Sequence, residues 1–204
     1  MIDRHPESKD DKLEKYWREL TDLARDGKLN PAIGRDEEIH RTIQVLSRRA
    51  KNNLILIGES RDAKTAIVEG LAQQIIHKDV PDVLKDRRVF ALNMKELVTE
   101  AANPDEFGEC LKAVLEKVTE DKEKIILFID EIHRIIDEEA SQKVADAFNF
   151  LKPMLPRGEL QYIGATTPDE YRNRLEKDGV FGRRFQAIMV DEATADASKD
   201  FENH

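Results

Sequence analysis

The chain has 204 residues and a formal net charge of −9, and charged residues make up 37% of it. This length is enough for one domain of ordinary size. The negative charge argues against nucleic acid as the main partner, because basic residues are needed to hold a phosphate backbone. The single cysteine, Cys110, excludes an internal disulfide and a metal cage built from cysteines, and it is compatible with a reducing compartment.

Residues 1–12 are polar and charged, and we expect a flexible segment there, without the apolar core of a signal peptide. No stretch approaches the ~18 apolar residues of a membrane-spanning helix. We therefore expect a cytoplasmic protein with no membrane partner. The folded domain is expected to span residues 13–192, and a polar tail is expected at 193–204.

Helical spacing of apolar residues between Leu13 and Leu23 predicts a first helix, and acidic residues after Arg35 open a second. Short apolar runs predict five strands, at 54–57, 89–93, 125–129, 160–165 and 185–190. Further helices are expected at 66–76, 94–101, 107–118, 144–151 and 168–177. Because strands alternate with helices, the sequence predicts an α/β fold with a five-stranded parallel sheet and helices on both faces.

Three polar clusters follow the predicted strands: Lys64-Thr65, Asp130-Glu131 and Thr166-Thr167. Ligands of parallel sheets bind at the carboxyl ends of the strands, so we expect these clusters to converge in space. Each cluster is ambiguous alone, since an Asp-Glu pair after a strand is often a helix cap and Lys-Thr after a loop is common. Their joint occurrence favours a nucleotide-binding fold.

The order strand, Gly58, loop, Lys64-Thr65, helix is the context of a phosphate-binding P-loop, or Walker A loop. In such a loop the lysine contacts the outer phosphates and the hydroxyl helps to hold Mg²⁺. Asp130 is then expected to complete the Mg²⁺ shell, and Glu131 to polarise an attacking water. The last glycine of the pattern G-x-x-x-x-G-K-[ST] is replaced by Ala63, so the loop is degenerate.

Longer stretches follow one family pattern, at residues 29–38, 43–46, 65–72, 126–133, 151–153, 164–171 and 183–186. On these residues the sequence closely resembles the first ATPase domain of the ClpB-type protein disaggregases. These proteins belong to the AAA+ class together with the ClpA and ClpC unfoldases. The resemblance runs from about residue 16 to residue 190, in register and without evident gaps.

The resemblance implies a role for each matching position. Ile33 and Gly34 would meet the adenine of ATP or ADP, and Thr167 would sense the terminal phosphate. Arg183 and Arg184 match arginine fingers, which act on nucleotide held by the neighbouring subunit of a hexameric ring. The family's phosphate loop corresponds to Gly58, Glu59, Ser60, Arg61, Asp62, Ala63, Lys64 and Thr65. Asp130 and Glu131 match its metal-holding and water-activating pair.

The chain departs from the family at that loop, which reads Gly-Glu-Pro-Gly-x-Gly-Lys-Thr in relatives. Two loop glycines are replaced by Arg61 and Ala63, although glycine serves where backbone approaches a ligand closely. Asp62 places a negative charge near the expected phosphates, with repulsion of order 1 kcal/mol per solvated pair. We therefore expect weak binding of ATP, ADP and Mg²⁺.

Other departures concern the substrate and the ring. The family's aromatic pore loop, Lys-Tyr-Arg-Gly, aligns with Ala102-Asn103-Pro104-Asp105, which has no aromatic residue to grip a polypeptide. The glycine-rich loop after the Asp-Glu pair reads Asp137-Glu138-Glu139-Ala140. The small helical lid subdomain of the family is expected to be absent.

These features predict an AAA+ ATPase module of a ClpB-like chaperone, with weak nucleotide binding and negligible turnover. Its expected partners are other AAA+ subunits or Clp-type rings and, in the family, unfolded polypeptide. A pseudo-ATPase interaction module that binds or caps active rings is the alternative. An inactive fragment or engineered variant is a further alternative that the sequence does not separate from it.

Overall fold

The computed structural model describes residues 13–120, 124–136, 160–177 and 183–192. Several sequence predictions lie outside these described residues. They are the segment 1–12, the acidic loop 137–140, the helix 144–151, the matching stretch 151–153 and the tail 193–204.

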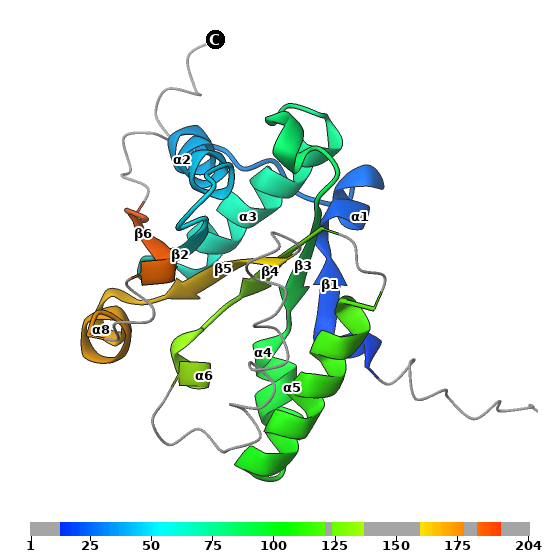
Figure 1. The fold of residues 1–204 in the computed structure, drawn as a ribbon, viewed down its shortest axis with the longest axis vertical. Coiled ribbons are helices and arrows are strands. Elements are labelled where there is room, and N and C mark those ends of the chain that lie inside the picture. Colours follow the sequence, from blue (N-terminus) through cyan, green and yellow to red (C-terminus); the bar gives the residue numbers. More distant parts are fainter. Residues whose placement is uncertain (1–12, 121–123, 137–159, 178–182, 193–204) are drawn as a thin grey trace, which may run out of the picture.

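A six-stranded, mostly parallel sheet forms the centre of the molecule (Figure 1). Its strands are β1 (Trp17–Glu19), β2 (Asn53–Ile57), β3 (Arg88–Leu92), β4 (Ile125–Ile129), β5 (Leu160–Thr166) and β6 (Phe185–Met189). Their order in the sheet is β1-β3-β4-β5-β2-β6, and all neighbours are parallel except β1 and β3. The predicted α/β class and the five parallel strands are confirmed.

The sixth strand replaces part of the helix that was expected between Leu13 and Leu23. A 3-10 turn (η1, Glu14–Tyr16) leads into β1, and the short helix α1 (Leu20–Arg25) follows. Trp17 pairs with Leu92 of β3, and the N–H of Asn93 donates to the Tyr16 carbonyl at 2.7 Å. An uncovered β3 would leave a row of unpaired backbone groups at the edge of the sheet. Pairing with that edge therefore outweighs the local helical spacing.

Helices cover both faces of the sheet (Figure 1). One face carries α1, α2 (Asp36–Leu46) and α3 (Arg61–Ile76), and the other carries α4 (Met94–Glu100) and α5 (Pro104–Val118). Short elements complete the described chain, namely η2 (Asp82–Leu84), α6 (His133–Ile136), α8 (Pro168–Glu170) and a π-helical turn, η4 (Tyr171–Leu175). None of the helices in these described parts is both long enough and apolar enough to span a bilayer.

The side chains of β2 alternate between two hydrophobic cores, one on each face. Leu54 and Leu56 pack with the α2–α3 layer, whereas Ile55 and Ile57 pack with the α4–α5 layer. All five residues of β2 are buried, as expected for a strand covered on both sides. Each buried Leu or Ile side chain of β2 contributes about 1.5–3 kcal/mol to the stability of the fold through its removal from water. The two cores therefore hold the end of the strand in place.

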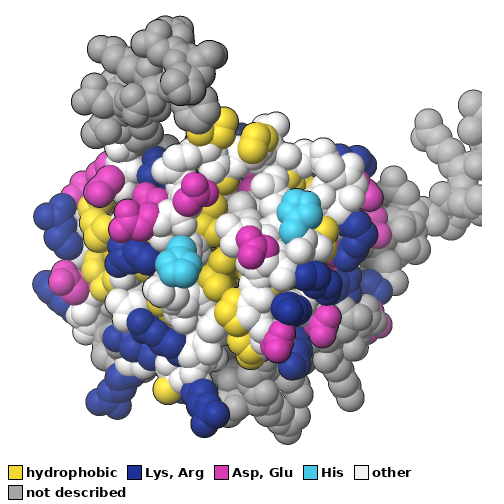
Figure 2. All heavy atoms as spheres, turned by 90° about the horizontal axis from the view of Figure 1, so that it is seen from above, with side chains coloured by type: hydrophobic (Ala, Val, Ile, Leu, Met, Phe, Trp, Pro, Cys, Tyr) yellow, Lys and Arg dark blue, Asp and Glu magenta, His cyan; other side chains and the backbone are white. Residues whose placement is uncertain are grey.

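Charged side chains of both signs share the surface. On the face drawn in Figure 2, Lys and Arg lie among Asp and Glu, with hydrophobic side chains between them. The described side chains on this face therefore offer a mixed surface and no single field of one sign.

Gly58 ends β2 at a point where the backbone of another strand comes very close. A Cβ atom on Gly58 would lie 2.7 Å from the carbonyl oxygen of Val190, just after β6. The N–H of Gly58 donates to the Thr166 carbonyl, and the N–H of Val190 donates to the Ile57 carbonyl. Glycine is required here because backbone atoms cannot give way as a flexible side chain can.

We expect Gly58→Ala to lower the free energy of unfolding by about 1–3 kcal/mol, through overpacking against the Val190 backbone. Urea unfolding monitored by circular dichroism measures this loss. The matched control is Gly164→Ala, whose Cβ would meet the end of the flexible Ile132 side chain at 2.8 Å. An equal or smaller loss in Gly58→Ala than in the control would contradict the assignment.

Candidate functional site

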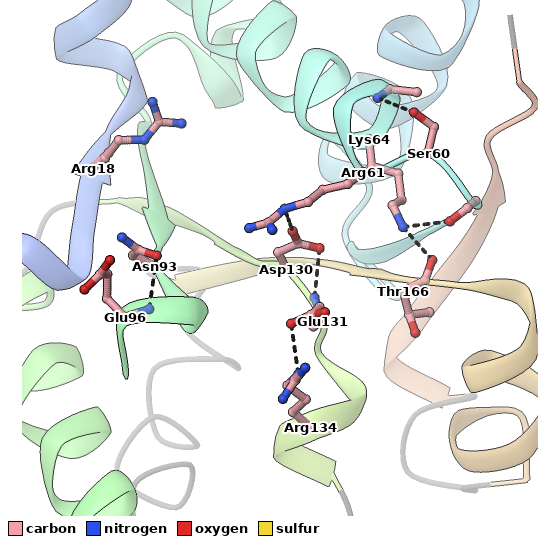
Figure 3. Close-up of polar contacts among 12 residues, drawn as sticks. Arg18, Ser60, Arg61, Lys64, Asn93, Glu96, Asp130, Glu131, Arg134 and Thr166 are labelled. Atoms are coloured by element: carbon pink, nitrogen blue, oxygen red, sulfur yellow. Dashed lines mark hydrogen bonds and ion pairs between the residues drawn. The ribbon is translucent and has the colours of Figure 1, made fainter. Parts of the chain in front are cut away.

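Three strand ends form the site edge, which we define as the carboxyl ends of β2, β4 and β5 (Figure 3). The ammonium of Lys64 donates to the carbonyl of Gly58 at 2.7 Å and to that of Thr166 at 3.1 Å. The guanidinium of Arg61 lies 2.9 Å from the carboxylate of Asp130. The three polar clusters that are distant in sequence therefore meet at this edge, as predicted.

The phosphate-loop segment is largely helical. Helix α3 begins at Arg61, five residues before the start at residue 66 that the sequence predicts. The hydroxyl of Ser60 accepts the N–H of Ala63 at 3.2 Å, which makes Ser60 the N-cap. The Ser60 carbonyl accepts the N–H of Lys64 at 3.3 Å. The predicted helix start is wrong because arginine and alanine form helices readily where glycine does not.

Lys64 is buried, with only 4% of its surface exposed. Burial lowers the pKa of its ammonium, while the negative charges of Asp130, Glu59 and Glu131 act in the opposite direction. Two main-chain carbonyls satisfy the group, so the lysine faces into the protein. The positive charge of Lys64 therefore faces the carbonyl groups at the ends of β2 and β5.

Both oxygens of the Asp130 carboxylate have partners in the chain. Oδ2 lies 2.9 Å from Nε of Arg61, and Oδ1 accepts the N–H of Glu131 at 2.9 Å (Figure 3). The Asp130 side chain is 11% exposed, whereas that of Arg61 is 63% exposed. The ion pair thus joins a buried carboxylate to an arginine that lies over it at the surface.

Glu131 has the left-handed backbone angle φ of 52°, which is uncommon for a residue other than glycine. Its carboxylate lies 2.9 Å from Nε of Arg134, three residues on. Its carbonyl also accepts the N–H of Arg134 at 2.9 Å. The carboxylate expected to polarise water is therefore held by a neighbouring cation.

Threonines 166 and 167 are engaged in different contacts. The ring nitrogen Nδ1 of His133 lies 2.9 Å from the Thr166 hydroxyl, and burial lowers the pKa of this histidine. The Thr167 hydroxyl accepts the N–H of Glu170 at 3.4 Å and caps α8. Thr167 thus has a local structural role, at the edge where a phosphate sensor is expected.

In this arrangement Mg²⁺ would have to displace Arg61 before it could bind Asp130. This ion takes oxygen ligands at about 2.0–2.1 Å in octahedral geometry. The Asp130 carboxylate is already paired with the guanidinium of Arg61 and with the N–H of Glu131. Within the described residues, no group of three or more His, Cys, Asp or Glu side chains is placed to hold a metal ion.

The expected adenine contacts lie in a surface turn. Ile33 is 71% exposed, and Gly34 has a φ of 76°, a value that glycine adopts easily. Arg35, which is buried, donates to the carbonyl of Asp191 at 2.7 Å and to the Glu38 carboxylate at 3.1 Å. This arginine fastens the turn to the chain beyond β6.

Arg183 and Arg184 lie at the amino ends of the parallel strands, opposite the site edge. They are exposed and directly precede β6, whose first residue Phe185 pairs with Asn53 at the beginning of β2. Lys64 lies beyond the other end of β2, so roughly 13 Å of strand separates the two sites at about 3.3 Å per residue. The two arginines are therefore not brought to the site edge of their own chain.

Three contacts of the site are missed by sequence reasoning. Ser60 before a run of helix formers is a recognisable capping signal, and Glu131 with Arg134 has the i, i+3 spacing of a helical ion pair. The contact of Arg61 with Asp130 has no local signal, since 69 residues separate the two.

Comparison with known proteins places these features in context. The family described as SMAX1 nucleotide binding domain matches residues 30–154. The chaperone protein ClpB 2 of Synechocystis is 58% identical over 192 residues, which cover 94% of this chain and 22% of that protein. The chain thus spans about a fifth of the length of this relative.

Solved structures show the same similarity. A closed state of Hsp104 with ATPγS and FITC casein is 48% identical with a TM-score of 0.78, covering 91% of this chain and 32% of that one. The Hsp104–ADP complex of S. cerevisiae has the same identity and coverage, with a TM-score of 0.77. The large shared identity supports common ancestry as well as a common fold.

We expect the wild-type protein to lose stability as the pH falls below about 6.5, because the pKa of His133 is lowered in the fold. In that range the unfolded chain binds a proton that the folded chain does not. His133→Gln should flatten this dependence in urea unfolding followed across the range. The exposed His77 provides the matched control, His77→Gln, which should keep the wild-type slope. Equal slopes in both variants would count against the assignment.

Proposed function

This chain belongs to the family described as SMAX1 nucleotide binding domain and is similar to the ClpB and Hsp104 chaperones. From this premise we propose that it is an AAA+ module that binds nucleotide weakly and hydrolyses it negligibly. The contacts of the expected site residues with ATP or ADP stay a proposal. Unfolded polypeptide, as the casein of the Hsp104 complex, is a proposed substrate of the whole machine and not of this domain alone. A cytoplasmic location stays a prediction.

The closed form of the phosphate loop is the observation that carries this proposal. A P-loop works by aiming main-chain N–H groups and a lysine at phosphates. Here the N–H of Ala63 is capped by Ser60, and the Lys64 ammonium points to the carbonyls of Gly58 and Thr166. A nucleotide would have to open these contacts before it could occupy the loop.

The size of the penalty follows from the contacts that must open. Loss of the Ser60 cap costs about 1 kcal/mol. Displacement of Arg61 from the buried Asp130 carboxylate by Mg²⁺ costs about 1 kcal/mol, because water screens the guanidinium, which is 63% exposed. Asp62 adds repulsion of about 1 kcal/mol against a solvated phosphate. A total of about 2–3 kcal/mol weakens binding roughly 30- to 150-fold.

Turnover is reduced by a separate contact. A general base must reach the water whose proton it takes. The Glu131 carboxylate is instead paired with Arg134 at 2.9 Å. We propose that this pair keeps Glu131 from acting as a base even when nucleotide is present.

The segment aligned with the pore loop also has a structural role. Asn103 caps α5 by accepting the N–H of Glu106 at 2.9 Å, and the Glu106 carboxylate accepts the N–H of Ala102 at 3.0 Å. These reciprocal bonds make a rigid turn between α4 and α5. Such a turn supports the proposal that this chain does not grip a threaded polypeptide.

A second candidate function is that of an interaction module in a ring of active relatives. Arg183 and Arg184 favour this role, because they are exposed at the amino ends of the parallel strands, opposite the chain's own site. They precede β6 at the end of the strands away from Lys64, so they are not placed to act on nucleotide bound at the chain's own loop. In this role the chain would act on nucleotide held by another AAA+ subunit.

We expect wild-type protein to bind ATP in the presence of Mg²⁺ with a Kd above about 100 µM, measured by isothermal titration calorimetry. The double variant Arg61→Gly/Ala63→Gly should bind at least about tenfold more tightly, because each glycine weakens the start of α3 by about 1 kcal/mol. Ala66→Gly weakens the same helix outside the loop and should leave the affinity unchanged.

Phosphate release from the same samples tests turnover. Wild-type protein should release phosphate no faster than Glu131→Gln. Micromolar ATP binding by the wild type, or equal affinities in wild type and double variant, would refute this account of the loop.

Mixing the chain with a catalytically active ClpB ring tests the interaction role. Excess wild-type protein should change the ATPase rate of that ring by at least about twofold, because its arginines would act on nucleotide bound by a ring subunit. A twofold change corresponds to about 0.4 kcal/mol in the activation free energy of hydrolysis. Arg183→Ala/Arg184→Ala should abolish the change. Arg172→Ala/Arg174→Ala, which alters two arginines of η4, should retain it. No effect of the wild type would exclude this function.

A further inference from the structure

Two arginines of this chain face the two adjacent carboxylates of the site edge. Arg61 lies against Asp130, and Arg134 lies against Glu131, each with Nε 2.9 Å from a carboxylate oxygen (Figure 3). The two arginines come from different elements, since Arg61 opens α3 and Arg134 belongs to α6. The negative charge of the pair is therefore balanced inside the chain.

The Arg61 guanidinium has the properties of a permanent counter-ion. It is a planar cation that binds carboxylates with directed N–H groups. Asp130 is its partner at the buried end of β4, where a carboxylate without a cation would be costly. In a P-loop site this carboxylate serves the divalent metal.

We propose that Arg61 takes the place of the divalent metal at Asp130, so that phosphate ligands reach this pocket without Mg²⁺. The inference deepens the proposed weak nucleotide binding by naming the ligand as a metal-free nucleoside polyphosphate. Its basis is the pairing of both Asp130 oxygens within the chain.

Tethering favours the arginine over a dissolved ion. Arg61 is the first residue of α3, and only three residues separate it from the end of β2, so its side chain is held beside Asp130 at a high effective concentration. A metal ion that entered would also lie close to the displaced guanidinium and would be repelled by it. Because Arg61 neutralises Asp130 as part of the same chain, a phosphate ligand needs no metal ion to offset the charge of that carboxylate.

Fluorescence titration with mant-ADP, in Mg²⁺ and in EDTA, tests the inference. In wild-type protein the Kd should differ by less than about twofold between the two conditions. In Arg61→Ala, which keeps a helix-forming residue at the start of α3, Mg²⁺ should tighten binding at least about tenfold. Arg172→Ala removes an arginine that pairs with Asp169 and should behave as wild type. Magnesium dependence in the wild type as large as in Arg61→Ala would overturn the inference.

A metal-binding measurement decides the question where mant-ADP binding is too weak to titrate. Mn²⁺, which takes the same oxygen ligands as Mg²⁺, broadens the NMR signals of nearby nuclei. The amide signals of residues 130–132 should stay sharp in wild-type protein and broaden in Arg61→Ala. Broadening in the wild type, or none in the variant, would overturn the proposed replacement.

The outcomes separate this inference from the proposed function. Tight mant-ADP binding that does not depend on Mg²⁺ would refute weak nucleotide binding and leave the role of Arg61 intact. Weak mant-ADP binding that Mg²⁺ strengthens in the wild type would support weak nucleotide binding and refute the proposed role of Arg61.

Discussion

Lys64 donates from a buried ammonium to the carbonyls of Gly58 and Thr166, so a single charge ties together the ends of β2 and β5. A buried charge is costly unless it is paired or hydrogen-bonded, and nearby carboxylates add further support. The close approach of Gly58 to the Val190 backbone joins β6 to the same point. The lysine can stay there only because the strand ends converge. The inward direction of its charge then governs what the loop can bind.

The residues that replace the loop glycines are consistent with one another. Ala63 and Arg61 favour helix, Ser60 caps it, and Asp62 places a negative charge in the first turn, where the helix dipole favours one. Each local preference supports the same closed form, which is how a sequence comes to specify one structure. Arg61 then also supplies the charge that Asp130 needs. The segment expected to hold phosphates is thus a capped helix start with an internal counter-ion.

The carboxyl ends and the amino ends of the parallel strands carry different sets of the expected functional residues. At the site edge, the side chains expected to hold nucleotide contact one another. At the amino ends, Arg183 and Arg184 remain exposed ahead of β6. If the proposed weak nucleotide binding holds, a domain with exposed arginines at 183 and 184 is suited to act through a neighbour. This division favours a role within an assembly over independent catalysis.

The sequence alone determined the five parallel strands, the two-sided burial of the sheet and the meeting of Lys64 with Asp130 at one edge. These follow from short-range signals, namely apolar runs, strand–helix alternation and polar residues after strands. The tertiary structure decided that residues 17–19 form an edge strand, that α3 begins at Arg61, and that Arg61 pairs with Asp130. The start of α3 depends on the neighbouring Ser60 cap, whereas the edge strand and the ion pair depend on distant partners, since 69 residues separate Arg61 from Asp130. No local pattern encodes such a contact, because only the folded sheet brings its two members together.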